Sequence, residues 1–195
     1  MRVILSCVLC VTFSFIFPWQ NSLAENPEWK ANTQFLPQYC KDRAKGSQSP
    51  SFKRWRKTFG KAGVHMHHYC DGLYAEKQAK VTADKNKRSH WLRLAAYQMQ
   101  YVSGSCQPGC VLYPELHSIW GWALWQQGQV GEAIKHYQLA IQSKPTYTRA
   151  YADLADMYVK INESDEARKV LEAGLKVNPK SRKLKRRLLK LQPAA

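Results

Sequence analysis

Three histidines and a cysteine lie within six residues of one another: His65, His67, His68 and Cys70. Imidazole and thiolate groups are ligands that zinc and copper favour. On a helix, His65 and His68 share a face, and a free Cys70 would strengthen the site. The cluster therefore suggests a metal-binding or redox protein as one hypothesis. No Cys-x-x-Cys spacing occurs after residue 24, which favours ordinary core or surface histidines instead.

Other catalytic signatures are absent from the sequence. It contains no Gly-x-Ser-x-Gly motif, no phosphate-binding glycine-rich loop and no His-Glu-x-x-His motif. The acidic residues that general acid–base chemistry would use are few, 14 in all, and are scattered. The sequence thus predicts a non-enzymatic protein without a cofactor.

The first 24 residues have the pattern of a secretory signal peptide. Arg2 precedes an uncharged apolar run at residues 3–17, and small Ser22 and Ala24 stand at the third-last and last positions. The run is shorter than the ~20 residues that a helix needs to span a bilayer. We expect cleavage after Ala24 and an exported protein, periplasmic or secreted. An uncleaved segment would instead be a membrane anchor.

Export changes how the cysteines are interpreted, because disulfides persist in oxidising compartments. Four cysteines follow residue 24, and three pairings are open: the residues are Cys40, Cys70, Cys106 and Cys110. The Pro-Gly turn between Cys106 and Cys110 favours a short loop closed by that pair. The remaining pair would tie a poorly patterned segment to the next helix.

The chain is strongly basic, with 30 Lys and Arg, 14 Asp and Glu, and a formal charge of +16. Such a charge indicates acidic partners. An exported protein would rarely meet nucleic acid. Acidic protein surfaces, anionic lipid and acidic polysaccharide are therefore the candidate partners.

The region before the repeats divides into two parts. Residues 25–63 show little periodicity and are expected to be irregular, apart from two helical turns over residues 52–59. Residues 64–113 are expected to form a helical hairpin. Its helices are predicted over residues 64–80 and 89–102, with Ser89 as the N-cap of the second.

A 34-residue repeat is the strongest pattern in the sequence. Pro145 and Pro179 are 34 residues apart, which defines one unit at residues 114–147 and another at residues 148–181. Bulky and small residues recur at matching positions of the two units. The matched pairs are Trp120 and Leu154, Gly121 and Ala155, Leu124 and Tyr158, Ala133 and Ala167, Tyr137 and Leu171, and Ala140 and Gly174.

This pattern resembles the tetratricopeptide repeat family. The resemblance implies an all-α fold of antiparallel helical hairpins, with small residues where backbones approach and proline ending each second helix. The family favours an aromatic residue at position four, where Tyr151 fits and His117 departs. Residues 182–195 would then form a basic C-terminal capping helix.

The resemblance also implies a binding site. In this family the first helices of successive repeats line a concave groove that holds a peptide of a partner protein. Carried over to this sequence, the partner-binding residues are Trp122, Trp125, Arg149, Asp156, Lys183, Arg186, Arg187 and Lys190. An acidic peptide with an apolar anchor would suit them, and an adaptor or scaffold in an envelope assembly is one role that this site would serve. Alternatively, the two tryptophans pack against the N-terminal hairpin.

The basic C-terminal helix has two interpretations. Its cations would suit docking on anionic lipid or acidic polysaccharide. Its narrow stripe of Leu184, Leu188 and Leu191 would equally suit packing against the second repeat, which leaves the cations solvated. Packing is favoured because a terminal helix needs that stripe to attach to the array.

Overall fold

The computed structural model describes residues 28–191, so the signal peptide expected at residues 1–24 lies outside the described part. Within residues 28–191 the regular elements are helices, which confirms the all-α prediction. In chain order these are α1 Glu28–Ala31, α2 Gln38–Ala44, α3 Pro50–Phe59, the 3-10 helix η1 Gly60–His65, α4 Met66–Val81, α5 Lys85–Ser103, α6 Tyr113–Gln126, α7 Val130–Ser143, α8 Thr148–Lys160, α9 Ser164–Val177 and α10 Arg182–Leu189.

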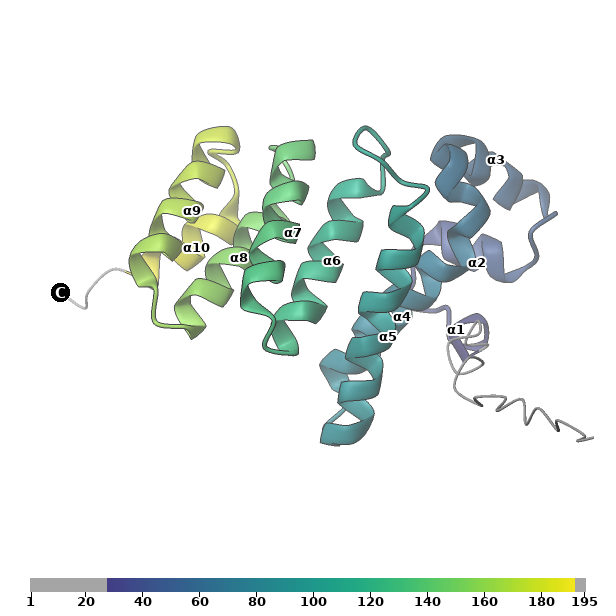
Figure 1. Ribbon diagram of the computed structural model, residues 1–195. Coiled ribbons are helices and arrows are strands. Elements are labelled where there is room, and N and C mark those ends of the chain that lie inside the picture. Colours follow the sequence, from purple (N-terminus) through teal and green to yellow (C-terminus); the bar gives the residue numbers. More distant parts are fainter. Residues whose placement is uncertain (1–27, 192–195) are drawn as a thin grey trace, which may run out of the picture.

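The helices stack side by side in one row, from α2 and α3 at one end to α9 and α10 at the other (Figure 1). Packing is closest within the hairpins α4–α5, α6–α7 and α8–α9, and each hairpin then packs on the next. The pairs α6–α7 and α8–α9 lie within the two ranges predicted as repeats. This nearest-neighbour packing is what a helical-repeat array requires.

Small residues mark where the helices of this array come closest. A Cβ added at Gly121 would lie 3.0 Å from the backbone oxygen of Ala133 in the facing helix. One added at Gly174 would lie 2.8 Å from Leu184 Cδ1 and 2.9 Å from Tyr151 Cγ. Gly174 therefore lets α9 pack against both α8 and α10, which explains the small residue at this position of the repeat.

The substitution Gly174→Ala is expected to lower the free energy of unfolding by about 1–3 kcal/mol, because the added methyl group overpacks a filled site. Leu184 is 0% exposed and the Tyr151 ring is 5% exposed, so neither can move aside into solvent. Urea unfolding followed by circular dichroism measures the change. Gly131→Ala is the matched control, since its Cβ meets nothing within 4 Å. An equal loss in both variants would contradict this account.

The N-terminal region is more regular than the sequence analysis expected. Residues 25–63 were expected to be irregular apart from two helical turns over residues 52–59. Helix α3 contains those turns, and the described part also contains α1, α2 and the start of η1. Ser49 caps α3 by accepting a hydrogen bond from the Phe52 amide at 3.3 Å, and Pro50 occupies the first turn. Proline is favourable there because the first amides of a helix lack an intrahelical acceptor. Pro50 thus starts a helix rather than interrupting one.

Two disulfides secure this part of the chain, and they are the two pairs that the sequence analysis favoured. Cys40 of α2 pairs with Cys70 of α4, 30 residues apart. Cys106 pairs with Cys110 in the connection between α5 and α6. The first bond joins the N-terminal helices to the α4–α5 hairpin, and both of its cysteines are 0% exposed.

The α4–α5 hairpin begins its second helix earlier than predicted. Ser89 was the expected N-cap, but the cap is Asp84, whose carboxylate accepts from the Lys87 amide at 2.8 Å. A carboxylate at this position satisfies a free amide and also interacts favourably with the helix dipole. The prediction placed the start at the first apolar residues, whereas the first turn of α5 is polar and exposed.

At the other end, α10 closes the array through its leucines. Leu184 is 0% exposed in a cluster with Tyr151 and Leu171, and Leu188 and Leu191 pack at its edge. Ser181 caps the helix by accepting from the Leu184 amide. The stripe is therefore used for packing, as the capping interpretation expected. Among the described helices, none has the length and apolar character needed to cross a bilayer.

Candidate functional site

A pocket of about 450 Å³ lies where α4, α6, α8 and α10 meet. These are the first helices of successive hairpins and the capping helix, the elements that the family resemblance assigns to a groove. We call it the central pocket. Its lining residues are Lys80, Trp122, Trp125, Arg149, Asp153, Asp156, Val159, Lys160 and Lys183.

The two tryptophans have different roles in this pocket. Trp122 is 9% exposed and belongs to a core cluster with Ala75 and Ala79 of α4. It therefore packs against the N-terminal hairpin, as the alternative interpretation expected. The ammonium group of Lys80 lies 4.7 Å from the centroid of the Trp122 ring. Trp125 is only partly buried, so it is the aromatic side chain with more surface left for a ligand.

An ion-pair network forms one wall of the central pocket. Arg149 of α8 pairs with Glu76 of α4 and, at 3.1 Å, with Asp153. Lys80 also reaches Glu76, at 2.5 Å. The Glu76 side chain is 8% exposed, so both of its cationic partners compensate a nearly buried charge. These contacts join α4 directly to α8 and fix the orientation of the Arg149 guanidinium.

In this network, burial and neighbouring charges shift the pKa values in opposite directions. Burial raises the pKa of Asp153 above its usual value, while Arg149, Lys183 and Lys80 act to lower it. Burial alone would lower the pKa of Arg149, but the attraction of Glu76 and Asp153 raises it instead. Arg149 is therefore held firmly in its charged form. Arg149 thus presents a fixed positive charge to the pocket.

The predicted site residues on α10 separate into three kinds. Lys183 lines the central pocket. Arg187 donates through Nε and Nη2 to the two carboxylate oxygens of Asp156, at 2.8 and 2.7 Å, so it clamps α10 onto α8. Arg186 and Lys190 are exposed and do not line the pocket. The structure thus brings Trp122, Trp125, Arg149, Asp156 and Lys183 together, as the resemblance implied, and leaves Arg186 and Lys190 outside.

Lys80 is a pocket residue that the sequence analysis missed. It lies in α4, before the repeats, where no repeat position identified it. Only the stacking of α4 beside α6 brings it over Trp122. No local signal in the sequence could have shown this contact, since it depends on the hairpin preceding the first repeat.

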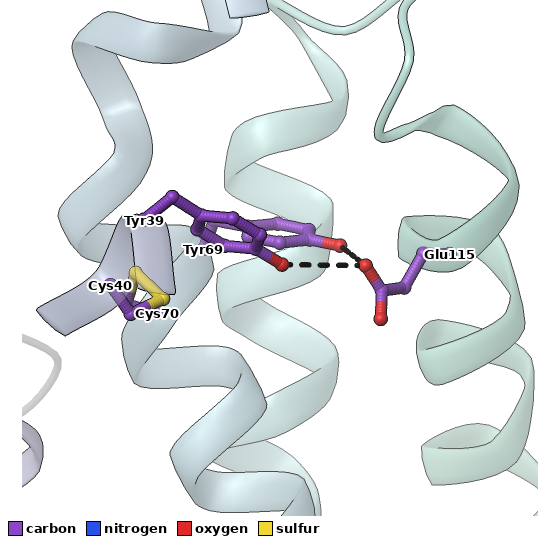
Figure 2. The surroundings of a disulfide bond; sticks show 5 residues. All are labelled: Tyr39, Cys40, Tyr69, Cys70 and Glu115. Carbon is purple, nitrogen blue, oxygen red and sulfur yellow. Dashed lines mark hydrogen bonds between the residues drawn. A yellow bond between two sulfur atoms is a disulfide. The ribbon is translucent and has the colours of Figure 1, made fainter. Parts of the chain in front are cut away.

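A second polar cluster lies beside the Cys40–Cys70 disulfide. Glu115 of α6 accepts hydrogen bonds from Tyr69 at 2.7 Å and from Tyr39 at 3.5 Å through one oxygen (Figure 2). Burial, and then the nearby Glu115 charge, raises the pKa of both tyrosines above its usual value. Both therefore stay protonated and act as donors. Because each tyrosine immediately precedes a bonded cysteine, the disulfide helps to aim both hydroxyls at the first repeat.

A histidine pair lies between α6 and α7. The Nδ1 atoms of His117 and His136 are 2.8 Å apart, and the His136 ring stacks on Trp120 with centroids 4.0 Å apart. Burial lowers the pKa of each histidine to about 4. His117 stands where the repeat pattern expects an aromatic residue, and it fills that place with a ring that stacks and hydrogen bonds.

The metal-site hypothesis at residues 65–70 is wrong in one essential point. Cys70 is bonded to Cys40, so it has no thiolate to offer. His68 has its Nδ1 2.7 Å from Gln98 Oε1, and the rings of His65 and His68 are 6.4 Å apart. Within residues 28–191 no three potential ligands gather closely enough to hold a metal ion.

Comparison with protein families matches residues 124–189 to a family described as tetratricopeptide repeat. The match runs from α6 through α10, the region that supplies most of the central pocket. No curated protein matches the chain.

Proposed function

Because this chain carries tetratricopeptide repeats over residues 124–189, and such repeats generally mediate protein–protein interaction, we propose that it is an exported adaptor without catalytic activity. It holds a short segment of a partner protein in the central pocket. The observation that carries the proposal is the pocket itself, because its walls come from the first helices of successive hairpins and combine aromatic with charged side chains.

The charges of the pocket favour an acidic ligand. Glu76 and Asp153 compensate Lys80 and Arg149, and Arg187 compensates Asp156. Two further lining cations, Lys160 and Lys183, are exposed and have no ion pair among the described residues. The pocket therefore has an excess of positive charge that a carboxylate could neutralise.

An apolar or aromatic residue of the ligand would complete the contact. Trp125 is partly exposed beside Val159, which is 40% exposed. Burying such side chains in a small central patch supplies much of the binding energy in protein interfaces. The proposed ligand is thus a peptide with an acidic residue a few positions from an apolar anchor.

The proposed location follows from the first 24 residues and the cysteines. The signal-like segment supports export, and two disulfides are consistent with an oxidising compartment. A periplasmic or secreted scaffold, for example in an envelope assembly, combines these properties. Sequencing the N-terminus of the exported protein tests the location, because cleavage should place residue 25 first.

The combined change Trp125→Ala and Lys183→Glu is expected to weaken partner binding at least about tenfold, since it removes an anchor and reverses a lining charge. Pull-down of the tagged, exported protein with quantitative mass spectrometry measures the loss. Both side chains are partly or fully exposed, so the fold should survive.

The control is Lys185→Glu with Arg186→Glu, two exposed positions on α10 that do not line the pocket. A partner retained by the native protein and the control, but lost by the pocket variant, supports the proposal. A partner that the folded pocket variant retains would place the binding site elsewhere.

A further inference from the structure

The N-terminal end of the array carries a concentrated positive charge that the central pocket does not use. Between Asp42 and Asp71 the sequence has no acidic residue. Residues 41–61 hold eight Lys and Arg and one Asp, so they supply a net charge of +7 out of +16 for the chain. Even in a basic protein, this is a local excess.

Helix α3 gathers four of these cations on its outer half. Phe52 and Phe59 are 1% and 7% exposed, and with partly buried Trp55 they fix one side of α3 to the core. The helical period then turns Lys53, Arg54 and Lys57 away from the core, and Arg56, one turn after Phe52, is exposed at the edge of the packed side. We call these four exposed cations, Lys53, Arg54, Arg56 and Lys57, the cationic face of α3.

The cationic face has no internal partner. Within the described residues no ion pair involves any of its four side chains. Asp42, the nearest acid in sequence, is 5% exposed and already accepts from Trp55 at 3.0 Å, Gln38 at 3.0 Å and Lys45 at 3.3 Å. The four charges therefore repel one another without local compensation, an arrangement that an external anion would relieve.

We propose that the cationic face of α3 docks on an anionic lipid bilayer. A planar surface can meet all four side chains at once. A polymer bound in the pocket beside α3 would contact only one of the four cations, because Arg54 is the only one of them that lines this pocket. The arrangement thus favours docking on a flat anionic membrane over binding of an anionic polymer in a groove.

The position at which the chain enters the described part also supports a lipid bilayer as the partner of the cationic face. Helix α1 packs against α2 and α4, so the chain enters the described part beside these two helices, at the N-terminal end of the array. The segment before Glu28 contains the apolar run at residues 3–17. Whenever this run is inserted in a membrane, during export or afterwards, about ten residues of chain link it to the α1–α3 region. A chain of that length keeps Glu28 within roughly 35 Å of the lipid, and so keeps the N-terminal end of the array, which includes α3, on the membrane side.

Flotation of the exported protein with vesicles tests the proposal. Vesicles of phosphatidylcholine alone are compared with vesicles that also contain phosphatidylglycerol, at low and high salt. The native protein is expected to bind the anionic vesicles more strongly, and high salt should weaken that preference. Each cation near an anionic surface contributes about fivefold, so replacing all four with Gln should reduce the preference at least about 100-fold.

The matched control replaces four exposed cations of α10 with Gln, at Arg182, Lys185, Arg186 and Lys190. It removes the same charge and should keep most of the preference. An equal loss in both variants would show that net charge alone attracts the protein, and a greater loss in the control would assign docking to α10. Either result overturns the proposal, as would binding to a soluble acidic polysaccharide such as alginate without binding to anionic vesicles.

Discussion

Lowering the pH from about 7 to about 4 is expected to destabilise this protein by on the order of 3 kcal/mol through His117 and His136, about half of what two full shifts would give, because His136 is only partly buried. Their Nδ1 atoms are 2.8 Å apart, a distance that allows one shared proton but not one proton on each atom. Burial lowers the pKa of both to about 4, while an unfolded histidine titrates near 6.5.

The direction follows from the two pKa values. Between about pH 6.5 and pH 4 the unfolded chain binds protons at these two positions that the folded protein does not. Their contribution to stability is therefore fully present above pH 6.5 and is lost as the pH falls toward 4. Neighbouring charges modify this only partly, because Glu132 raises and Lys135 lowers the pKa of His136 less than burial does.

Urea unfolding at a series of pH values checks the prediction. The double variant His117→Gln, His136→Gln keeps hydrogen-bonding side chains but cannot titrate, so its stability should fall less over this range. His90→Gln, an exposed position on α5, is the control and should follow the native profile. If the double variant and the native protein lose stability in parallel, the pair does not govern acid sensitivity.

Replacing Cys40 and Cys70 with Ala is expected to lower the free energy of unfolding by about 3–4 kcal/mol. The bond closes a loop with a sequence separation of 30, and such a constraint reduces the entropy of the unfolded chain. Its loss would also release Tyr39 and Tyr69 from the positions in which they donate to Glu115. Guanidinium unfolding without reductant measures the change.

Removing the Cys106–Cys110 bond provides the comparison. This bond closes a loop with a separation of only 4, so its loss should cost about 2 kcal/mol. The longer loop should therefore show the larger effect. A larger loss from the Cys106–Cys110 variant would mean that the turn between α5 and α6 stabilises the fold by another route.

The repeat region could be predicted in detail because its determinants are local. Pro145 and Pro179 set the period, and the family resemblance placed small residues such as Gly121 and Gly174 where helix backbones come closest, as the structure shows. The family resemblance also assigned to the groove four residues of α6 and α8 that line the pocket: Trp122, Trp125, Arg149 and Asp156. In each case the sequence neighbour is also the structural neighbour, so a pattern along the chain determines a contact in space.

The N-terminal region and the pocket rim could not be predicted in the same way. Residues 25–63 were expected to be largely irregular, although Ser49 followed by Pro50 is a recognisable signal for the start of α3. Lys80 reaches the pocket only because α4 stacks beside α6. Arg187 was predicted to bind a partner but forms an ion pair with Asp156 instead. A cation at a groove position can bind either a ligand or a nearby carboxylate, and the sequence does not distinguish the two. These outcomes depend on which partner is nearest in three dimensions.

The Cys40–Cys70 bond also makes the two ends of the molecule differ in their resistance to a pulling force. Tension entering at α2 would pass through the covalent bond directly to α4, so residues 41–69 would lie outside the load path. At the opposite end, α10 is held by packing of Leu184 and by the Arg187–Asp156 clamp, and the hairpins there are joined by noncovalent contacts, among them the Arg149–Glu76 ion pair between α8 and α4. Under load the C-terminal hairpins would peel away one after another, while the cationic face of α3 kept its shape.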